Sequence, residues 1–175
     1  MSFSIEETVQ AIDKLIDKGK VKNLSVSNFT VEDLKRALKV SRHGIALNEI
    51  PYNLIDRTYD NNGTVKFCEE NGIAILCCRS LALGRLCGLQ EDLESPVLIK
   101  ALCDKYKKTS AQISLNWLLN KSNFATIIKS ENPANIRENV SSLEFKMSAQ
   151  DYKKLDNFHE DFLLSATGTK VMNSK

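Results

Sequence analysis

Apolar residues recur at three- and four-residue steps along the first part of the chain, which is the spacing of one face of a helix. Ser4 precedes this stripe as a helix N-cap, and Glu6 and Glu7 place negative charge in the first turn. Gly19 follows the stripe and marks its end. The pattern predicts one helix, whose apolar face consists of Ile5, Val9, Ile12, Leu15 and Ile16.

Short apolar runs and longer periodic segments then alternate along the chain. The short runs predict strands at residues 21–27, 45–50, 73–78 and 125–128. The periodic segments predict helices at residues 31–38, 59–70, 96–107, 110–120, 133–140 and 149–158. Thr30, Thr109 and Ser148 occupy the N-cap positions of three of these helices. Residues 81–94 contain Gly84 and Gly88 and are predicted to form a loop.

Strands that alternate with helices are typical of βαβ crossovers and a parallel sheet. The run at residues 73–78 is almost wholly apolar, as expected for a strand buried on both faces. The sequence therefore predicts an α/β fold with four parallel strands and additional C-terminal helices. A complete (β/α)₈ barrel needs roughly 250 residues, so 175 residues are too few to close one with a helix after every strand.

Composition limits the function classes. The chain is 42% hydrophobic and 26% charged, as in one soluble globular domain. Its net charge of +2 is not concentrated in a basic segment, which argues against a nucleic-acid partner. We expect a cytoplasmic protein with no membrane partner, because no apolar stretch approaches the roughly 20 residues of a membrane span and the first residues lack signal-peptide features. Five cysteines, an odd number, indicate reduced thiols rather than a disulfide framework.

Six short segments occur in a fixed order that carries more information than any one of them. They are Lys18–Val21, Leu24–Phe29, Asn48–Asn53, Gly72–Leu76, Ser110–Leu118 and Ile128–Pro133. In this order the chain resembles the C-terminal half of an aldo/keto reductase, a (β/α)₈ barrel that uses NADPH. The resemblance covers residues 1–158 and implies a truncated barrel, or half-barrel. Residues 159–175 show no clear period and are predicted to form a mobile tail.

The resemblance places nicotinamide contacts at the ends of the first two predicted strands. Ser27 and Asn28 offer a hydroxyl and an amide that can hold a planar carboxamide. From the residues alone, a role for Asn28 and Thr30 in capping the next helix is an equal alternative. Glu49 stands where the family commonly has Gln, and an ionised carboxylate can only accept hydrogen bonds. Its alternative interpretation is a partly buried Glu paired with a neighbouring Lys or Arg.

The third predicted strand ends in a departure from the family pattern. Cys78 stands where many relatives have a Tyr that stacks on nicotinamide, and Ser80 stands where they have Pro. A thiol has no flat face to stack, so this part of the pocket is weakened. The adjacent Cys77 and Cys78 also raise a metal or redox hypothesis, which lacks His or C-x-x-C partners at ligand spacing.

The loop after this strand is expected to lie over the cofactor pyrophosphate. Arg79 supplies a cation, and Leu81, Leu83 and Gly84 complete the predicted contacts at the family spacing.

The fourth predicted strand leads into an anion site at a helix N-terminus, where free N–H groups face the ligand. Lys129 and Ser130 add charge and a hydroxyl suited to the 2′-phosphate of NADP(H), and Glu138 and Asn139 match family residues that meet adenine. Asn135 stands where the family often has Arg, which removes a cationic partner for the phosphate. The alternative is an ordinary capped surface helix. These departures predict weak or lost NADP(H) binding.

Carbonyl reduction needs a proton donor as well as a hydride. In the family the donor is a Tyr tuned by Lys, Asp and His from the first four strands, and no residue of this chain matches that set. The tyrosines at 52, 59, 106 and 152 and the histidines at 43 and 159 fall elsewhere. We therefore predict no catalytic residue, no metal site and no turnover by this chain alone.

A half-barrel leaves two sheet edges unpaired, which invites association. The sequence therefore also predicts a binding or assembly module that forms a homodimer or complements a separate N-terminal half-barrel chain.

Overall fold

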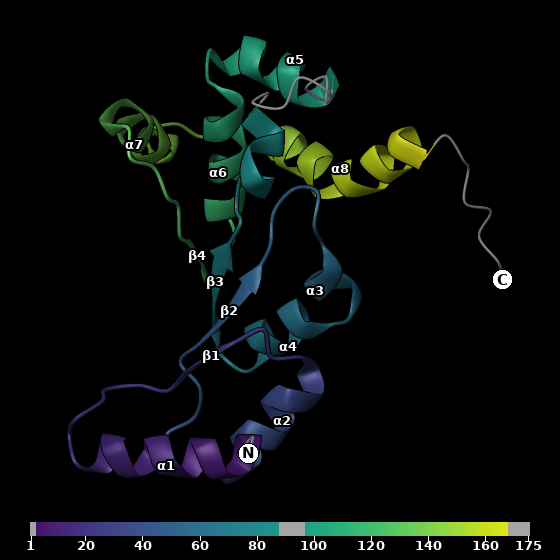
Figure 1. Ribbon diagram of the computed structural model, residues 1–175. Helices are drawn as coiled ribbons and strands as arrows, with labels where there is room; N and C mark the ends of the chain where they lie inside the picture. The colour runs from purple at the N-terminus through teal and green to yellow at the C-terminus, as the bar shows by residue number, and fades with distance from the viewer. Residues whose placement is uncertain (1–2, 88–96, 168–175) are drawn as a thin grey trace, which may run out of the picture. The chain divides into compact units, whose positions relative to one another are not determined.

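The computed structural model describes residues 3–87 and 97–167 (Figure 1). These residues form two compact units. Unit 1 contains the described residues up to Pro51, with Thr58–Cys78 and Asn123–Ala125. Unit 2 contains Tyr52–Arg57, Arg79–Ser122 and the described residues from Thr126 onward. None of the helices in the described ranges has the length and apolar character needed to cross a membrane.

A four-stranded sheet organises unit 1. Its strands follow chain order and are β1 (Ser25–Ser27), β2 (Leu47–Pro51), β3 (Ala74–Cys78) and β4 (Phe124–Thr126). β2 pairs in parallel with both β1 and β3, and the Ile75 N–H donates to Asn123 O at 2.9 Å beside β4. The predicted α/β fold with four parallel strands is confirmed, and each strand lies within two residues of its predicted position or inside it.

The helices of unit 1 are α1 (Ile5–Asp17), α2 (Val31–Val40), α3 (Thr58–Asn61) and α4 (Thr64–Glu70), and the first two begin where the sequence predicts. Ser4 caps α1 and Thr30 caps α2, each in a reciprocal capping box with the residue three positions on. Gly19 follows the C-terminal end of α1 with φ of 66°, and its N–H donates to Ile16 O at 2.8 Å.

The single helix predicted at residues 59–70 is wrong, because the structure breaks it into α3 and α4. Gly63 lies at the break with φ of 80°, a left-handed conformation that a continuous helix cannot contain. Asn61 and Asn62 precede it, and the Asn62 side chain accepts a hydrogen bond from Thr64 N–H at 3.0 Å. The Asn-Asn-Gly run is a turn signal inside an otherwise helical pattern.

The two faces of the sheet are covered to different extents. Asn48, Ile50, Ile75 and Cys77 are fully buried on one face. On the other face, the strand register aligns Ser25, Leu47 and Ala74 in one row and Ser27, Glu49 and Leu76 in the next. The two serines are exposed, and the other members of these rows are half-buried.

Unit 2 is helical. Its elements are the 3₁₀ segment η1 (Ala82–Cys87), α5 (Val97–Tyr106), α6 (Ser110–Leu119), α7 (Pro133–Val140), the 3₁₀ turn η2 (Ser141–Leu143) and α8 (Ala149–Thr167). Part of the predicted loop 81–94 is thus η1, and its residues 88–94 lie outside the described residues. The last helix extends to Thr167 rather than Phe158. Of the predicted tail, residues 168–175 lie outside the described residues.

The core of unit 2 contains a buried cation beside two stacked aromatic rings. The Arg57 guanidinium lies 4.0 Å from the Trp117 ring centre and 5.1 Å from that of Tyr52. Arg57 also donates to the Tyr52 hydroxyl at 2.6 Å, and the Trp117 indole N–H donates to Asp156 at 2.9 Å. These contacts explain how a charged residue that is 5% exposed is accommodated in an apolar core.

Candidate functional site

The turn after β1 presents two polar side chains to solvent. Ser27 and Asn28 are both exposed, and Asn28 has the left-handed φ of 60° that Asn tolerates better than most residues. The Asn28 amide donates to Ser27 Oγ at 3.1 Å, and the Tyr59 hydroxyl makes a long 3.4 Å contact with Asn28 Oδ1. Asn28 does not cap α2, because Thr30 alone holds that role. The helix-capping alternative is therefore wrong for Asn28.

Asn48, which the sequence reasoning did not assign to the site, fixes the shape of this turn. Its side chain is fully buried, accepts from Phe29 N–H at 3.3 Å and donates to Phe29 O at 2.9 Å. One amide thereby satisfies both peptide groups of the residue after Asn28. A buried Asn in the middle of an apolar strand was the available signal.

Glu49 lies directly opposite Ser27 in the strand register. Its backbone carbonyl accepts the Asn28 N–H at 2.8 Å, which ties the turn to β2. The carboxylate is half-buried, and within the described ranges it has no ion pair or hydrogen bond. The alternative prediction, in which Glu49 pairs with a neighbouring Lys or Arg, is therefore wrong for the described residues. Ser27, Asn28 and Glu49 are thus brought together in unit 1.

The loop after β3 has an unusual backbone. Arg79, Ala82, Leu83 and Gly84 all have positive φ, at 54°, 50°, 58° and 88°. For residues other than glycine this conformation costs roughly 1–2 kcal/mol each, and such strain clusters at ligand sites. Two N–H groups of this loop are used in its own turns, because the Ala82 N–H donates to Arg79 O at 2.8 Å and the Gly84 N–H donates to Leu81 O at 2.9 Å.

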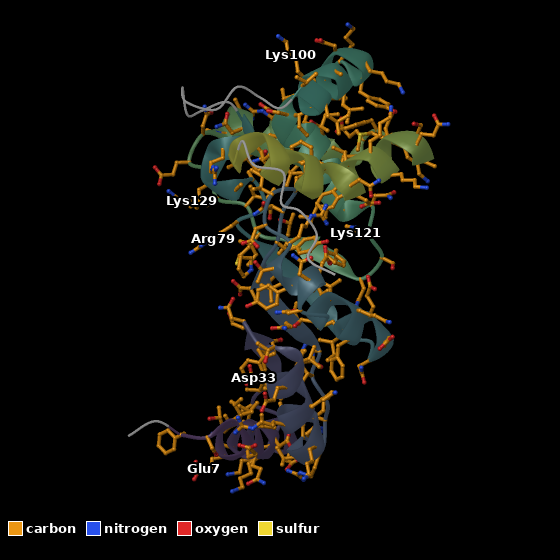
Figure 2. All side chains as sticks on the ribbon, turned by 90° about the vertical axis from the view of Figure 1, so that its right-hand side faces the viewer. Glu7, Asp33, Arg79, Lys100, Lys121 and Lys129 are labelled. Atoms are coloured by element: carbon orange, nitrogen blue, oxygen red, sulfur yellow. The ribbon has the colours of Figure 1, made fainter. Side chains whose placement is uncertain are left out.

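Arg79 and Leu83 are two exposed side chains of this loop. The Arg79 side chain projects from the ribbon in Figure 2 and is exposed to solvent. The Arg79 carbonyl accepts from the Asn53 amide at 3.0 Å. Like Asn48, Asn53 was not assigned to the site from the sequence, and it anchors the loop that was predicted to contact the cofactor. Leu83 is 76% exposed, whereas Leu81 is half-buried.

Cys78 and Ser80 are placed less favourably for a ligand. Cys78 is half-buried at the end of β3, and Ser80 is buried with its hydroxyl bonded to Thr126 Oγ1. Cys68, Cys77, Cys78 and Cys103 are in the thiol form. Nowhere in the described ranges do three His, Cys, Asp or Glu side chains gather as a metal ion requires.

The segment before α7 contains the predicted phosphate contacts. Lys129 projects from the ribbon in Figure 2 and pairs with Glu131 at 2.7 Å, with both side chains more than four-fifths exposed. An exposed pair of this kind contributes little stability, so Lys129 is available to another anion. Ser130 Oγ accepts from Asn132 N–H at 3.2 Å, and Asn132 Oδ1 accepts the Ala134 N–H at 2.9 Å.

The later residues of α7 divide between two environments. Asn135 is exposed, and Asn139 is half-buried. The Glu138 carboxylate accepts from the Thr109 hydroxyl at 2.6 Å, and its carbonyl accepts from the Gln112 amide at 3.3 Å. Glu138 therefore joins α7 to the N-terminus of α6, so an adenine contact would share this carboxylate with Thr109.

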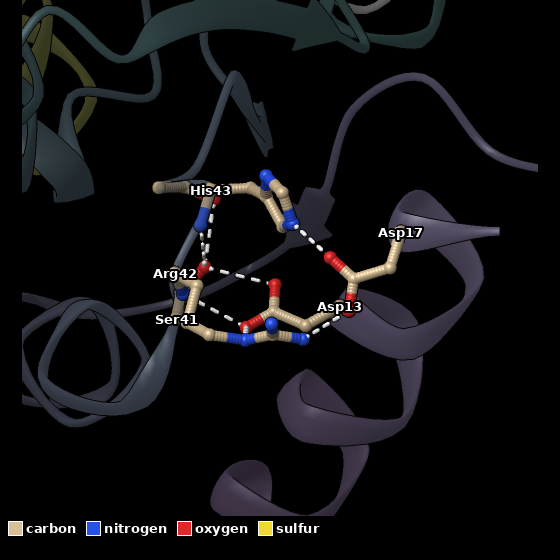
Figure 3. Close-up of polar contacts among 6 residues, drawn as sticks. Asp13, Asp17, Ser41, Arg42 and His43 are labelled. Atoms are coloured by element: carbon tan, nitrogen blue, oxygen red, sulfur yellow. Dashed lines mark hydrogen bonds and ion pairs between the residues drawn. The ribbon is translucent and has the colours of Figure 1, made fainter. Parts of the chain in front are cut away.

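A second polar cluster joins α1 to the segment after α2 (Figure 3). The buried carboxylate of Asp13 accepts from Arg42 N–H at 2.8 Å and from the Ser41 hydroxyl at 3.3 Å. Asp17 contacts Arg42 and lies 2.9 Å from His43 Nε2, and these two hydrogen bonds, His43 first, lower the pKa of the Asp17 carboxyl. The Ser41 hydroxyl points to Asp13 and the Gly44 carbonyl, not to the imidazole. The cluster is a structural tie and not a Ser-His-Asp triad.

Comparison with known proteins fits this geometry. The model of the aldo/keto reductase family matches residues 1–160. Aldose reductase B of Dictyostelium discoideum is 33% identical over 161 residues, which cover 91% of this chain and 49% of that relative. The NADPH-dependent alpha-keto amide reductase of Saccharomyces cerevisiae is 32% identical over 155 residues, which cover 87% and 49%. The chain belongs to the aldo/keto reductase family, and it spans about half the length of the curated relatives it matches.

Solved structures show the same fold. A thermostable aldo-keto reductase, Tm1743, in complex with the inhibitor epalrestat superposes with a TM-score of 0.80 at 28% identity, over 89% of this chain and 55% of that one. A mutant of Gox0644 in complex with NADPH gives a TM-score of 0.76 at 27% identity, over 87% and 52%. The four parallel strands and their helices are therefore part of an aldo/keto reductase barrel.

Proposed function

We propose that this chain supplies the NADP(H)-binding part of an aldo/keto reductase that reduces aldehydes or ketones. When bound, NADPH supplies a hydride to the carbonyl carbon. The side chains of this chain then have one task, which is to hold and orient the dinucleotide. The observation that carries the proposal is the turn at Ser27 and Asn28, because it presents an amide and a hydroxyl beside Glu49 at adjacent parallel strands.

The residues present fit a dinucleotide only in part. A carboxamide finds a donor and an acceptor at Asn28 and Ser27, and the exposed Arg79 offers a cation to a pyrophosphate. Lys129 suits a phosphate, because its partner within the described ranges is a single exposed glutamate. Against this, Glu49 cannot donate when ionised, and Cys78 offers no ring. We therefore propose binding that is weaker than in relatives with the full set.

We also propose that these residues correspond to the C-terminal half of the family barrel. The support is the order of the six segments and the four parallel strands in chain order. On this assignment the proton-donating Tyr and its Lys, Asp and His belong to the other half. The chain of 175 residues would then bind cofactor without reducing carbonyl compounds.

A fluorescence titration with NADPH tests the cofactor role. We expect saturable binding by the wild-type chain and a dissociation constant about fivefold higher for Asn28→Gly, because roughly 1 kcal/mol of hydrogen bonding is lost. Glycine is the chosen substitute because it adopts the positive φ of residue 28 without strain.

The matched control is Asn23→Ala. Asn23 is exposed and has no hydrogen bond to another residue in the described ranges, so its removal should leave the dissociation constant unchanged. A wild-type chain that is folded by circular dichroism yet shows no saturable binding would contradict the proposal. Equal affinity for NADPH in Asn28→Gly and in the wild type would show that the turn at Ser27 and Asn28 does not contribute to cofactor binding.

A further inference from the structure

Glu49 has a half-buried carboxylate without a counter-charge in the described ranges. Three other acidic side chains of unit 1 are buried or half-buried, and each accepts a hydrogen bond: from Arg36 at Glu6, from Arg42 at Asp13 and from Thr30 at Asp33. Withdrawing a charge from water is costly unless an opposite charge or hydrogen-bond donors compensate it. Among the described acidic groups of unit 1, Glu49 is therefore the one that a cationic ligand would stabilise most.

The strand neighbours of Glu49 are uncharged. In the register Glu49 lies between Ser27 of β1 and Leu76 of β3, and the adjoining turn offers the Asn28 amide. The less covered face of the sheet thus presents one negative charge among neutral polar and apolar side chains. Such a face attracts a ligand ring that carries positive charge more strongly than an otherwise identical neutral ring.

The two forms of NADP(H) differ in this property. The nicotinamide ring is cationic in NADP⁺ and neutral in NADPH, whereas the carboxamide and the phosphates are the same in both. We propose that Glu49 makes the site selective for NADP⁺ over NADPH, an inference that rests on the proposed cofactor role of Ser27, Asn28 and Glu49. Because NADP⁺ is the product of carbonyl reduction, Glu49 retains the spent cofactor and slows its release.

Isothermal titration calorimetry with NADP⁺ and with NADPH, at the same pH and ionic strength, tests this selectivity. The ratio of the NADPH dissociation constant to the NADP⁺ constant isolates the effect of charge, because a donor to the carboxamide affects both forms equally. We expect this ratio to fall about tenfold from wild type to Glu49→Gln, since the attraction between opposite charges is lost. Glu49→Ala also removes the charge and should lower the ratio to the same extent, so either variant suffices if the other fails to fold.

Glu69→Gln is the matched control. Glu69 is an exposed residue of α4 whose side chain has no ion pair or hydrogen bond in the described ranges, so removing its charge should leave the ratio unchanged. Glu49→Asp keeps the negative charge and should preserve part of the preference for NADP⁺.

The possible results separate this inference from the proposed function. A wild-type chain that binds NADPH at least as tightly as NADP⁺ would overturn the selectivity and leave the cofactor role intact. So would a ratio that Glu49→Gln and Glu49→Ala leave unchanged while both cofactor forms still bind. A folded wild-type chain that binds neither form would overturn both the selectivity and the proposed function.

Discussion

The amide of Asn48 shows how one buried side chain can shape a turn that presents polar side chains to solvent. It replaces water at both peptide groups of Phe29 and does so from a strand interior that excludes solvent. Asn53 acts in the same way on the next loop, because its side-chain amide donates to the carbonyl of Arg79. Ser27, Asn28 and Arg79 could be chosen from the sequence because motif order marks strand ends. The residues that position them could not, since their role depends on contacts 19 and 26 positions away.

Glu49 is the residue whose chemistry departs furthest from what a carboxamide needs. Its carboxylate has no partner in the described ranges and can only accept. Glu49→Gln should therefore lower the NADPH dissociation constant by roughly threefold to tenfold, because the new amide can also donate. Fluorescence titration measures the change.

Glu49→Ala is the comparison for this substitution. It removes the negative charge without adding a donor, so an equal gain in both variants would assign the effect to charge and contradict the hydrogen-bond explanation.

Helix boundaries in this chain follow local chemistry, and the sequence predicts the N-cap residues of three helices correctly. Ser4, Thr30 and Thr109 each accept the expected N–H in a capping box. The break at Gly63 was missed because the apolar spacing on either side continues through it. The extension of α8 to Thr167 was missed for the opposite reason, since periodicity ends before the helix does.

Contacts between elements were beyond sequence reasoning, and Asp151 is the clearest case. This α8 carboxylate is 1% exposed and accepts from Lys105 and Tyr106 of α5, both at 2.6 Å, and from Ser148 and Lys154. The Lys105 ammonium, followed by the Tyr106 hydroxyl, holds the pKa of the Asp151 carboxyl well below its usual range. Asp151 in turn raises the pKa of Lys105.

Asp151→Asn should lower the free energy of unfolding by about 1–3 kcal/mol at neutral pH, since a buried charged acceptor is lost. The folded pKa of Asp151 is depressed, so its stabilisation is present above the ordinary carboxyl pKa of about 4 and is lost as the pH falls from there through the folded pKa. Urea unfolding at a series of pH values should show a steeper acid loss in wild type than in Asp151→Asn. Asp104→Asn, at an exposed position of α5, should change the free energy by less than about 0.5 kcal/mol.

For the molecule as a whole, the fold class was available from the sequence because parallel strands separated by helices leave a strong alternating pattern. The division into two compact units was not, because the boundary falls within continuous βα segments at Pro51, Cys78 and Ala125 rather than at a linker. Ser27, Asn28, Glu49 and Cys78 belong to unit 1, whereas the loop from Arg79 and the α7 residues belong to unit 2.

The whole chain is the scale at which catalysis is decided. On the proposed assignment to the C-terminal half, this chain would hold the cofactor without a positioned acid, and general acid catalysis contributes roughly 10²–10⁴-fold to such reactions. The chain of 175 residues should therefore show no NADPH oxidation above background with a panel of small aldehydes, followed by absorbance, even at concentrations where NADPH binding is saturated. A full-length relative such as the Dictyostelium aldose reductase B, assayed with the same aldehydes and NADPH, serves as the positive control. Turnover that scales with the concentration of the purified chain would mean that an acid outside the Tyr-Lys-Asp-His set serves here.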